Sequence, residues 1–143
     1  MTVLLDDHLL RDWMVGPDRA LLRAVGRHDL ATTNLFYARL CKSAAAATTG
    51  TALLGGWNAE ERTAIAASLV ALSPEFSIVP MRELAWRMGV LVSEHTGLST
   101  LGSETVAAAQ TLDATVLVSA RDASPGVRRS CEALRIPYKT LPR

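Results

Sequence analysis

Short apolar runs typical of strands alternate with helical segments along this chain, and this alternation constrains the fold more than any other feature. The strand-like runs are residues 2–5, 30–33, 76–79, 115–119 and 138–141, and a helical pattern separates each run from the next. Residues 116–118 contain no polar side chain, as a strand buried on both faces of a parallel sheet requires. The order of elements therefore predicts an α/β fold with a central, mainly parallel sheet between layers of helices.

The segments between these runs carry apolar residues at helical spacing. The expected helices cover residues 8–14, 18–25, 34–47, 58–72, 81–94, 103–112 and 125–134. Asn34 and Asn58 stand where helix N-caps are expected. Residues 46–56 are small, polar and rich in glycine, which predicts a loop, and no Lys-Ser or Lys-Thr pair follows them to make a phosphate-binding loop.

Composition narrows the class of protein. The 143 residues suit a single domain, 1–143, and 49% hydrophobic against 20% charged residues indicates a chain that folds unaided. A net charge of +1 argues against strong non-specific binding to nucleic acid, so any RNA contact must come from clustered arginines.

We expect a cytoplasmic protein without a membrane span, because no apolar run reaches about 20 residues. Cys41 and Cys131 are expected to be free thiols, with a disulfide as the alternative.

The first strand ends in two acids and a histidine, Asp6, Asp7 and His8. In an open α/β sheet, ligands bind at the carboxyl ends of the strands, so Asp6 is the first candidate for a functional acid. The alternative is that Asp6 or Asp7 simply caps the helix that follows. The two interpretations differ in whether other acids converge on Asp6. We expect His8 to face solvent in the first turn of that helix, with a His8 that leans over the site as the alternative.

Three stretches of the chain carry a family resemblance: Val3–Asp6, Thr32–Leu40, and Gly97–Ser103 continuing through Leu117–Arg121. They resemble a PIN domain of the VapC toxin type, the small magnesium-dependent ribonucleases of bacterial toxin–antitoxin pairs. The resemblance extends over nearly the whole chain. It implies a three-layer α/β/α PIN-like fold, a homodimer, an RNA substrate, and an antitoxin partner whose segment lies over the acids.

The resemblance also implies four acids around one metal, and three of the four are replaced here. The first acid is Asp6, whereas the others fall on Arg39, Ser103 and Arg121, and Ser119 stands at the position of a hydroxyl residue. Asp6, Arg39 and Arg121 together carry about +1, which would repel a divalent cation. We therefore expect a chain that has lost metal-dependent RNA cleavage and acts through RNA or protein binding.

In this interpretation Arg39 forms an ion pair with Asp6 in place of the metal. Ser119, Arg39 and Arg121 are the expected binding residues. Arg128 and Arg129 would extend a patch that faces phosphates, although a solvated helix face is the simpler interpretation of that pair.

The alternative is an active endoribonuclease that binds Mg²⁺ or Mn²⁺ through neighbouring acids. Asp7, Glu104 and Asp122 each follow one of the family's acid positions by one residue. One residue along a helix turns a side chain by about 100°, so Glu104 is a poor substitute. An irregular residue after a strand can re-aim Asp122. In this alternative Asp6 and Asp122 hold the metal and carry the catalysis, with Asp7 or Glu104 as a further ligand.

Overall fold

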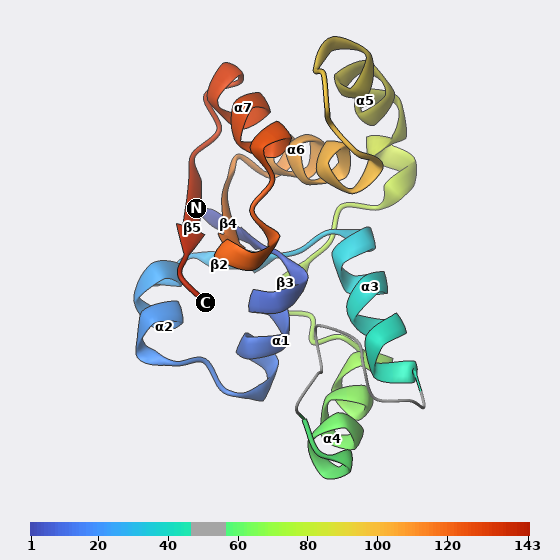
Figure 1. The fold of residues 1–143 in the computed structure, drawn as a ribbon, viewed down its shortest axis with the longest axis vertical. Helices are drawn as coiled ribbons and strands as arrows, with labels where there is room; N and C mark the ends of the chain where they lie inside the picture. The colour runs from blue at the N-terminus through green and yellow to red at the C-terminus, as the bar shows by residue number, and fades with distance from the viewer. Residues whose placement is uncertain (47–56) are drawn as a thin grey trace.

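A computed structural model describes residues 1–46 and 57–143 of the chain. In these residues five strands form one sheet in the order β3-β2-β1-β4-β5, and every neighbouring pair is parallel. Helices cover both faces of the sheet, as Figure 1 shows. The predicted three-layer α/β architecture is confirmed.

The strands are short, and helices connect them. The strands are β1 (Thr2–Leu5), β2 (Asp29–Ala31), β3 (Phe76–Ser77), β4 (Ala114–Ser119) and β5 (Tyr138–Leu141). The helices are α1 (Asp7–Val15), α2 (Arg19–Val25), α3 (Asn34–Ala45), α4 (Ala59–Val70), α5 (Met81–Glu94), α6 (Thr100–Leu112) and α7 (Pro125–Ala133), and a 3₁₀ turn, η1 (Ala120–Asp122), follows β4.

Alternation along the strands divides the core into two hydrophobic clusters. In β4, Val116 and Val118 pack into the cluster formed with α5, α6 and α7, whereas Leu117 packs into the cluster formed with α1, α2 and α4. Successive side chains of a strand point to opposite faces, so a strand covered on both sides must be apolar at every position. The unbroken apolar run in β4 follows from its place between β1 and β5.

Several elements begin or end at residues other than those expected; β3 ends at Ser77 rather than at 79, and α4 at Val70 rather than at 72. At two further elements, polar side chains form hydrogen bonds that set the ends. β2 ends at Ala31, since the Thr32 hydroxyl donates to the carbonyl of Leu5 and Thr33 caps α3 by accepting the N–H of Phe36. The N-cap of α3 is therefore Thr33 and not Asn34. Similarly, α6 begins at Thr100 rather than Ser103, because Ser99 caps it.

The start of α7 approaches the loop before α6 very closely. A Cβ atom at Gly126 would lie 2.6 Å from the carbonyl oxygen of Gly97, so no larger residue fits there without a shift of the backbone. The contact holds the start of α7 against the loop before α6.

Three other expectations concern the cysteines, the loop at 46–56 and membrane-spanning helices. Cys41 and Cys131 are both free, as expected. The loop predicted at 46–56 lies, apart from Ala46, outside the described residues. Among the helices of the two described stretches, none has the length and apolar character needed to cross a bilayer.

Candidate functional site

The candidate site lies where β1 and β4 end side by side. The two strands are parallel neighbours with Leu5 opposite Leu117, so the residues that follow them emerge at one edge of the sheet. Asp6 follows β1 directly, and Ser119 is the last residue of β4. This arrangement places Asp6, Asp7 and His8 opposite the segment Ser119–Asp122.

Asp6 is buried and both of its carboxylate oxygens accept backbone N–H groups. Oδ1 lies 2.8 Å from the N atom of Leu9 and caps α1, and Oδ2 lies 2.7 Å from the N atom of Ser119. Burial raises the pKa of Asp6 from 3.8 to about 7, although these two hydrogen bonds act to lower it. Asp6 is therefore a helix cap and also the acid on which others converge, so the two alternatives of the sequence analysis hold together.

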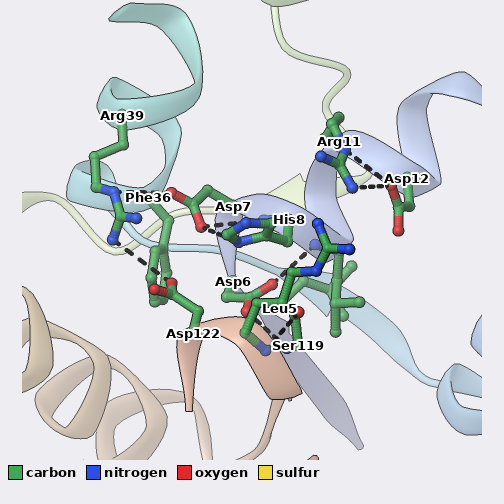
Figure 2. A network of polar contacts seen from close by, with 12 residues as sticks. Leu5, Asp6, Asp7, His8, Arg11, Asp12, Phe36, Arg39, Ser119 and Asp122 are labelled. Carbon is green, nitrogen blue, oxygen red and sulfur yellow. Dashed lines mark hydrogen bonds and ion pairs between the residues drawn. The ribbon is translucent and has the colours of Figure 1, made fainter. Parts of the chain in front are cut away.

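Three further groups converge on Asp6. Single ligand atoms of Asp6, Asp7, His8 and Asp122 all lie within 4.8 Å of one another. Figure 2 shows these side chains pointing toward a common centre from α1 and from η1. We call these four residues the acid cluster. Asp122 reaches it because the chain leaves β4 in a 3₁₀ turn, which is the kind of irregularity that re-aims a side chain.

The electrostatics of the acid cluster reflect its burial. Desolvation and the negative charge of Asp7 raise the pKa of Asp122. The pKa of His8 is raised above its ordinary value chiefly by its hydrogen bond to Asp7, whose Oδ1 lies 3.3 Å from Nδ1. His8 is 7% exposed, so the expectation that it faces solvent is wrong. Its ring is covered because α1 turns its first residues into the sheet edge.

Arg39 reaches the acid cluster from α3. Its Nε lies 2.9 Å from Oδ2 of Asp7, and its Nη1 lies 3.5 Å from Oδ2 of Asp122. The expected ion pair between Arg39 and Asp6 is not formed, and Asp7 takes the place of Asp6 in it. The reason is that the carboxylate of Asp6 faces the backbone N–H groups of Leu9 and Ser119, which leaves Asp7 facing α3 (Figure 2).

Arg121 lies outside the acid cluster, so its positive charge is not part of the charge of this site. Its side chain is exposed and lines a separate cavity, while its backbone N–H donates to the Ser119 hydroxyl. With all three carboxylates ionised, Asp6, Asp7 and Asp122 contribute −3 and Arg39 contributes +1, a formal charge of −2 that the raised pKa values of Asp6 and Asp122 make less negative. The expected charge of about +1, counted from Asp6, Arg39 and Arg121, does not describe this site, because Arg121 lies outside it and two further acids lie within it.

The two remaining candidate residues, Ser103 and Glu104, lie in α6 and form hydrogen bonds outside the acid cluster. The Ser103 hydroxyl donates to the carbonyl of Thr100 within its own helix. The buried carboxylate of Glu104 accepts the backbone N–H groups of Asn34 and Leu35, at 3.0 and 2.8 Å, and the amide of Asn34 at 2.6 Å. Glu104 thus accepts the backbone N–H groups at the start of α3 and does not join the acid cluster.

The donor set of the acid cluster suits a hard divalent cation such as Mg²⁺ or Mn²⁺. Oδ2 of Asp7, Nδ1 of His8 and Oδ2 of Asp122 are buried atoms that take part in ion pairs but form no hydrogen bond of regular geometry. Two of these atoms are the ones that pair with Arg39. A metal ion and the guanidinium would therefore compete for the same two oxygens.

Comparison with solved structures shows which known fold this chain shares. The sequence matches no protein-family profile and no curated protein. Among solved structures it resembles one chain in the structure of FitAB bound to the IR36 DNA fragment, with a TM-score of 0.63 and 14% identity, over 96% of this chain and 94% of that chain. FitAB is a toxin–antitoxin complex with a PIN-domain toxin.

The chain has a PIN-like fold. The fold places the end of β1, the middle of α3, the start of α6 and the exit of β4 around one edge of the sheet (Figure 1). In this PIN-like chain Asp6 lies at the first of these positions and Arg39 at the second. The sequence analysis did not assign Asp7 and His8 a central role. The signal was present in the unbroken Asp-Asp-His run after an apolar strand, because consecutive residues in the first turn of a helix cannot all face solvent.

Proposed function

We propose that this chain is a PIN-like protein of the toxin–antitoxin lineage that binds RNA without cleaving it. The observation that carries the proposal is the position of Arg39, whose guanidinium is ion-paired with Asp7 and Asp122. A guanidinium balances carboxylate charge as a metal would, but it has no coordination site at which to lower the pKa of a bound water. RNA that reaches this edge would meet charge and hydrogen-bond donors without an activated nucleophile.

Groups able to contact phosphates lie beside the acid cluster. Arg39 is about two-fifths exposed and Arg121 is exposed, whereas Ser119, the third expected binding residue, is buried. Arginine and serine side chains are common phosphate ligands in nucleic-acid complexes. An antitoxin-like protein partner and a homodimer belong to the same proposal, and the likeness to FitAB, a toxin–antitoxin protein, supports the partner.

Salt-dependent RNA binding tests this function. We expect a short single-stranded RNA to bind with an affinity that falls linearly on a log–log plot against salt concentration. Replacing one phosphate-contacting arginine should reduce that slope by about 0.7. Arg121→Gln is the test variant, and Arg82→Gln, an exposed residue on α5, is the matched control. RNA binding that does not respond to salt would overturn the proposal.

An active Mg²⁺- or Mn²⁺-dependent endoribonuclease is the second candidate function, and the convergence of four ligand atoms within 4.8 Å favours it. In this case Asp6, Asp7 and Asp122 would hold the ion once Arg39 has moved aside. Manganese-dependent RNA cleavage by the purified protein, abolished by Asp122→Asn and retained by Arg82→Gln, would establish this activity. Such cleavage would also exclude the proposal that the protein binds RNA without cleaving it.

A further inference from the structure

A second polar site lies beside the acid cluster and shares His8 with it. It is a cavity of about 360 Å³ bounded by α1, the start of α2, the turn η1 and the last residues of the described chain. Its volume falls at the lower end of the range for small-molecule pockets. Three arginines line it, Arg11, Arg121 and Arg143. The proposed function uses Arg121 as an RNA contact but assigns no role to the cavity itself.

Two of the three arginines are held in place by acids. Nη1 of Arg143 lies 2.9 Å from Oδ2 of Asp12, and its Nη2 lies 2.6 Å from Oδ1 of Asp18. Arg11 binds the other oxygen of Asp12 at 2.7 Å (Figure 2). Asp18 also caps α2. These ion pairs fix two guanidinium groups at the cavity wall without giving them a net charge.

Arg121 is the unbalanced charge of this cavity. It is exposed on η1 and forms no ion pair with the residues that the structure describes. Next to it lies Ser119, which is 0% exposed and whose hydroxyl accepts the Arg121 N–H. The Nε of Arg143 is also buried and lacks an acceptor. The accessible donors of the cavity are therefore those of the Arg121 guanidinium, whose positive charge has no ion-pair partner among the described residues.

This donor set matches a phosphate group. Guanidinium groups bind phosphate oxygens through paired, charge-assisted hydrogen bonds, and a phosphomonoester carries close to two negative charges near neutral pH. His8 is shared by the cavity and the acid cluster, since its ring contacts Asp7 and also lines the cavity. We propose that the cavity between α1, α2 and η1 binds a phosphomonoester, either a free nucleoside monophosphate or the terminal phosphate of an RNA strand.

Calorimetric titration with AMP and with inorganic phosphate tests the cavity directly. We expect AMP to bind, and Arg121→Gln to weaken it roughly tenfold or more, as the loss of charged hydrogen bonds implies. Arg82→Gln should bind AMP as the unmodified protein does. Arg121 is exposed, so its replacement should leave the fold intact. Absence of binding by both probes, or AMP binding that Arg121→Gln leaves unchanged, would overturn the inference.

Two RNAs of one sequence, with a 5′-phosphate or a 5′-hydroxyl, identify the source of the phosphate. A preference of about tenfold for the phosphorylated RNA would assign the cavity to RNA ends, and AMP binding without that preference would assign it to free nucleotides. The RNA comparison rests on the proposed function, whereas the AMP titration does not. AMP binding with no RNA binding would contradict the proposed function alone. RNA binding with no AMP binding and no preference for the 5′-phosphate would contradict this inference alone.

Discussion

Replacing Arg39 by alanine should convert the acid cluster into a site that binds Mn²⁺. The guanidinium lies 2.9 Å from an oxygen of Asp7 and 3.5 Å from an oxygen of Asp122, and both oxygens are candidate metal ligands. Its removal frees these oxygens and removes a positive charge that repels an incoming cation. The expected result is a gain of metal affinity in a variant that loses a charged side chain.

The magnitude follows from Coulomb's law. Two unit charges about 4 Å apart interact by about 1 kcal/mol in water and about 4 kcal/mol at an effective dielectric constant near 20, and a doubly charged ion doubles both figures. The Arg39 side chain is 40% exposed, so solvent screens it and the lower figure applies. Relief of about 2 kcal/mol corresponds to about a 30-fold gain in Mn²⁺ affinity.

Isothermal titration with MnCl₂ measures the gain. Arg39→Lys keeps the charge and should show little of it, and Arg82→Ala is the control for loss of an exposed arginine elsewhere. The metal-free Arg39→Ala variant should melt at a lower temperature, because its carboxylates lose their partner, and Mn²⁺ should restore the melting temperature. A folded Arg39→Ala variant with the Mn²⁺ affinity of the unmodified protein would refute the competition between Arg39 and a metal.

Three further predictions concern the fold around the site. Because burial raises the pKa of Asp6 from 3.8 to about 7, the folded state binds its proton more tightly than the unfolded state does. The contribution of Asp6 to the free energy of unfolding should therefore fall by up to about 4 kcal/mol as pH rises from about 4 to above 7, and urea titrations of Asp6→Asn should lack this part of the pH dependence. Glu104→Gln should lower the free energy of unfolding by about 1–3 kcal/mol, since it weakens the bonds that cap α3, and should leave Mn²⁺ binding in the Arg39→Ala background unchanged. An effect on metal affinity would place Glu104 in the metal site. Gly126→Ala should destabilise the protein by roughly 1–3 kcal/mol, because its Cβ would meet the carbonyl of Gly97, whereas Gly89→Ala, with open space around it in α5, should stabilise it by about 0.5–1 kcal/mol in thermal unfolding.

The elements of the fold could be predicted because their signals are local. The apolar run in β4 and the cap at Asn58, which accepts the N–H of Glu61, depend only on near neighbours along the chain. Predictions of element ends were less accurate where side chains bond across the fold. Thr32 reaches the carbonyl of Leu5, and the side chain of Asn34 donates to Val79 and Glu104, so that Thr33 rather than Asn34 caps α3.

The acid cluster was predicted in part. Asp6 and Asp122 are brought together as the alternative interpretation expected, and Asp7 joins them. Arg39 was assigned to the wrong acid because the orientation of Asp6 is set by the N–H of Ser119, which is 113 residues away. Similarly, no local pattern relates Glu104 to the start of α3.

Local patterns in the chain were enough to predict the α/β class, the strands and helices, and the position of Asp6 at the carboxyl edge of the sheet, since periodicity and capping act over a few residues. Which acidic and basic side chains form ion pairs depends on tertiary packing. The directions of Asp7, Arg39 and Asp122 depend on how α1, α3 and η1 pack around the sheet edge, and ion pairs form between side chains that this packing brings within a few ångströms.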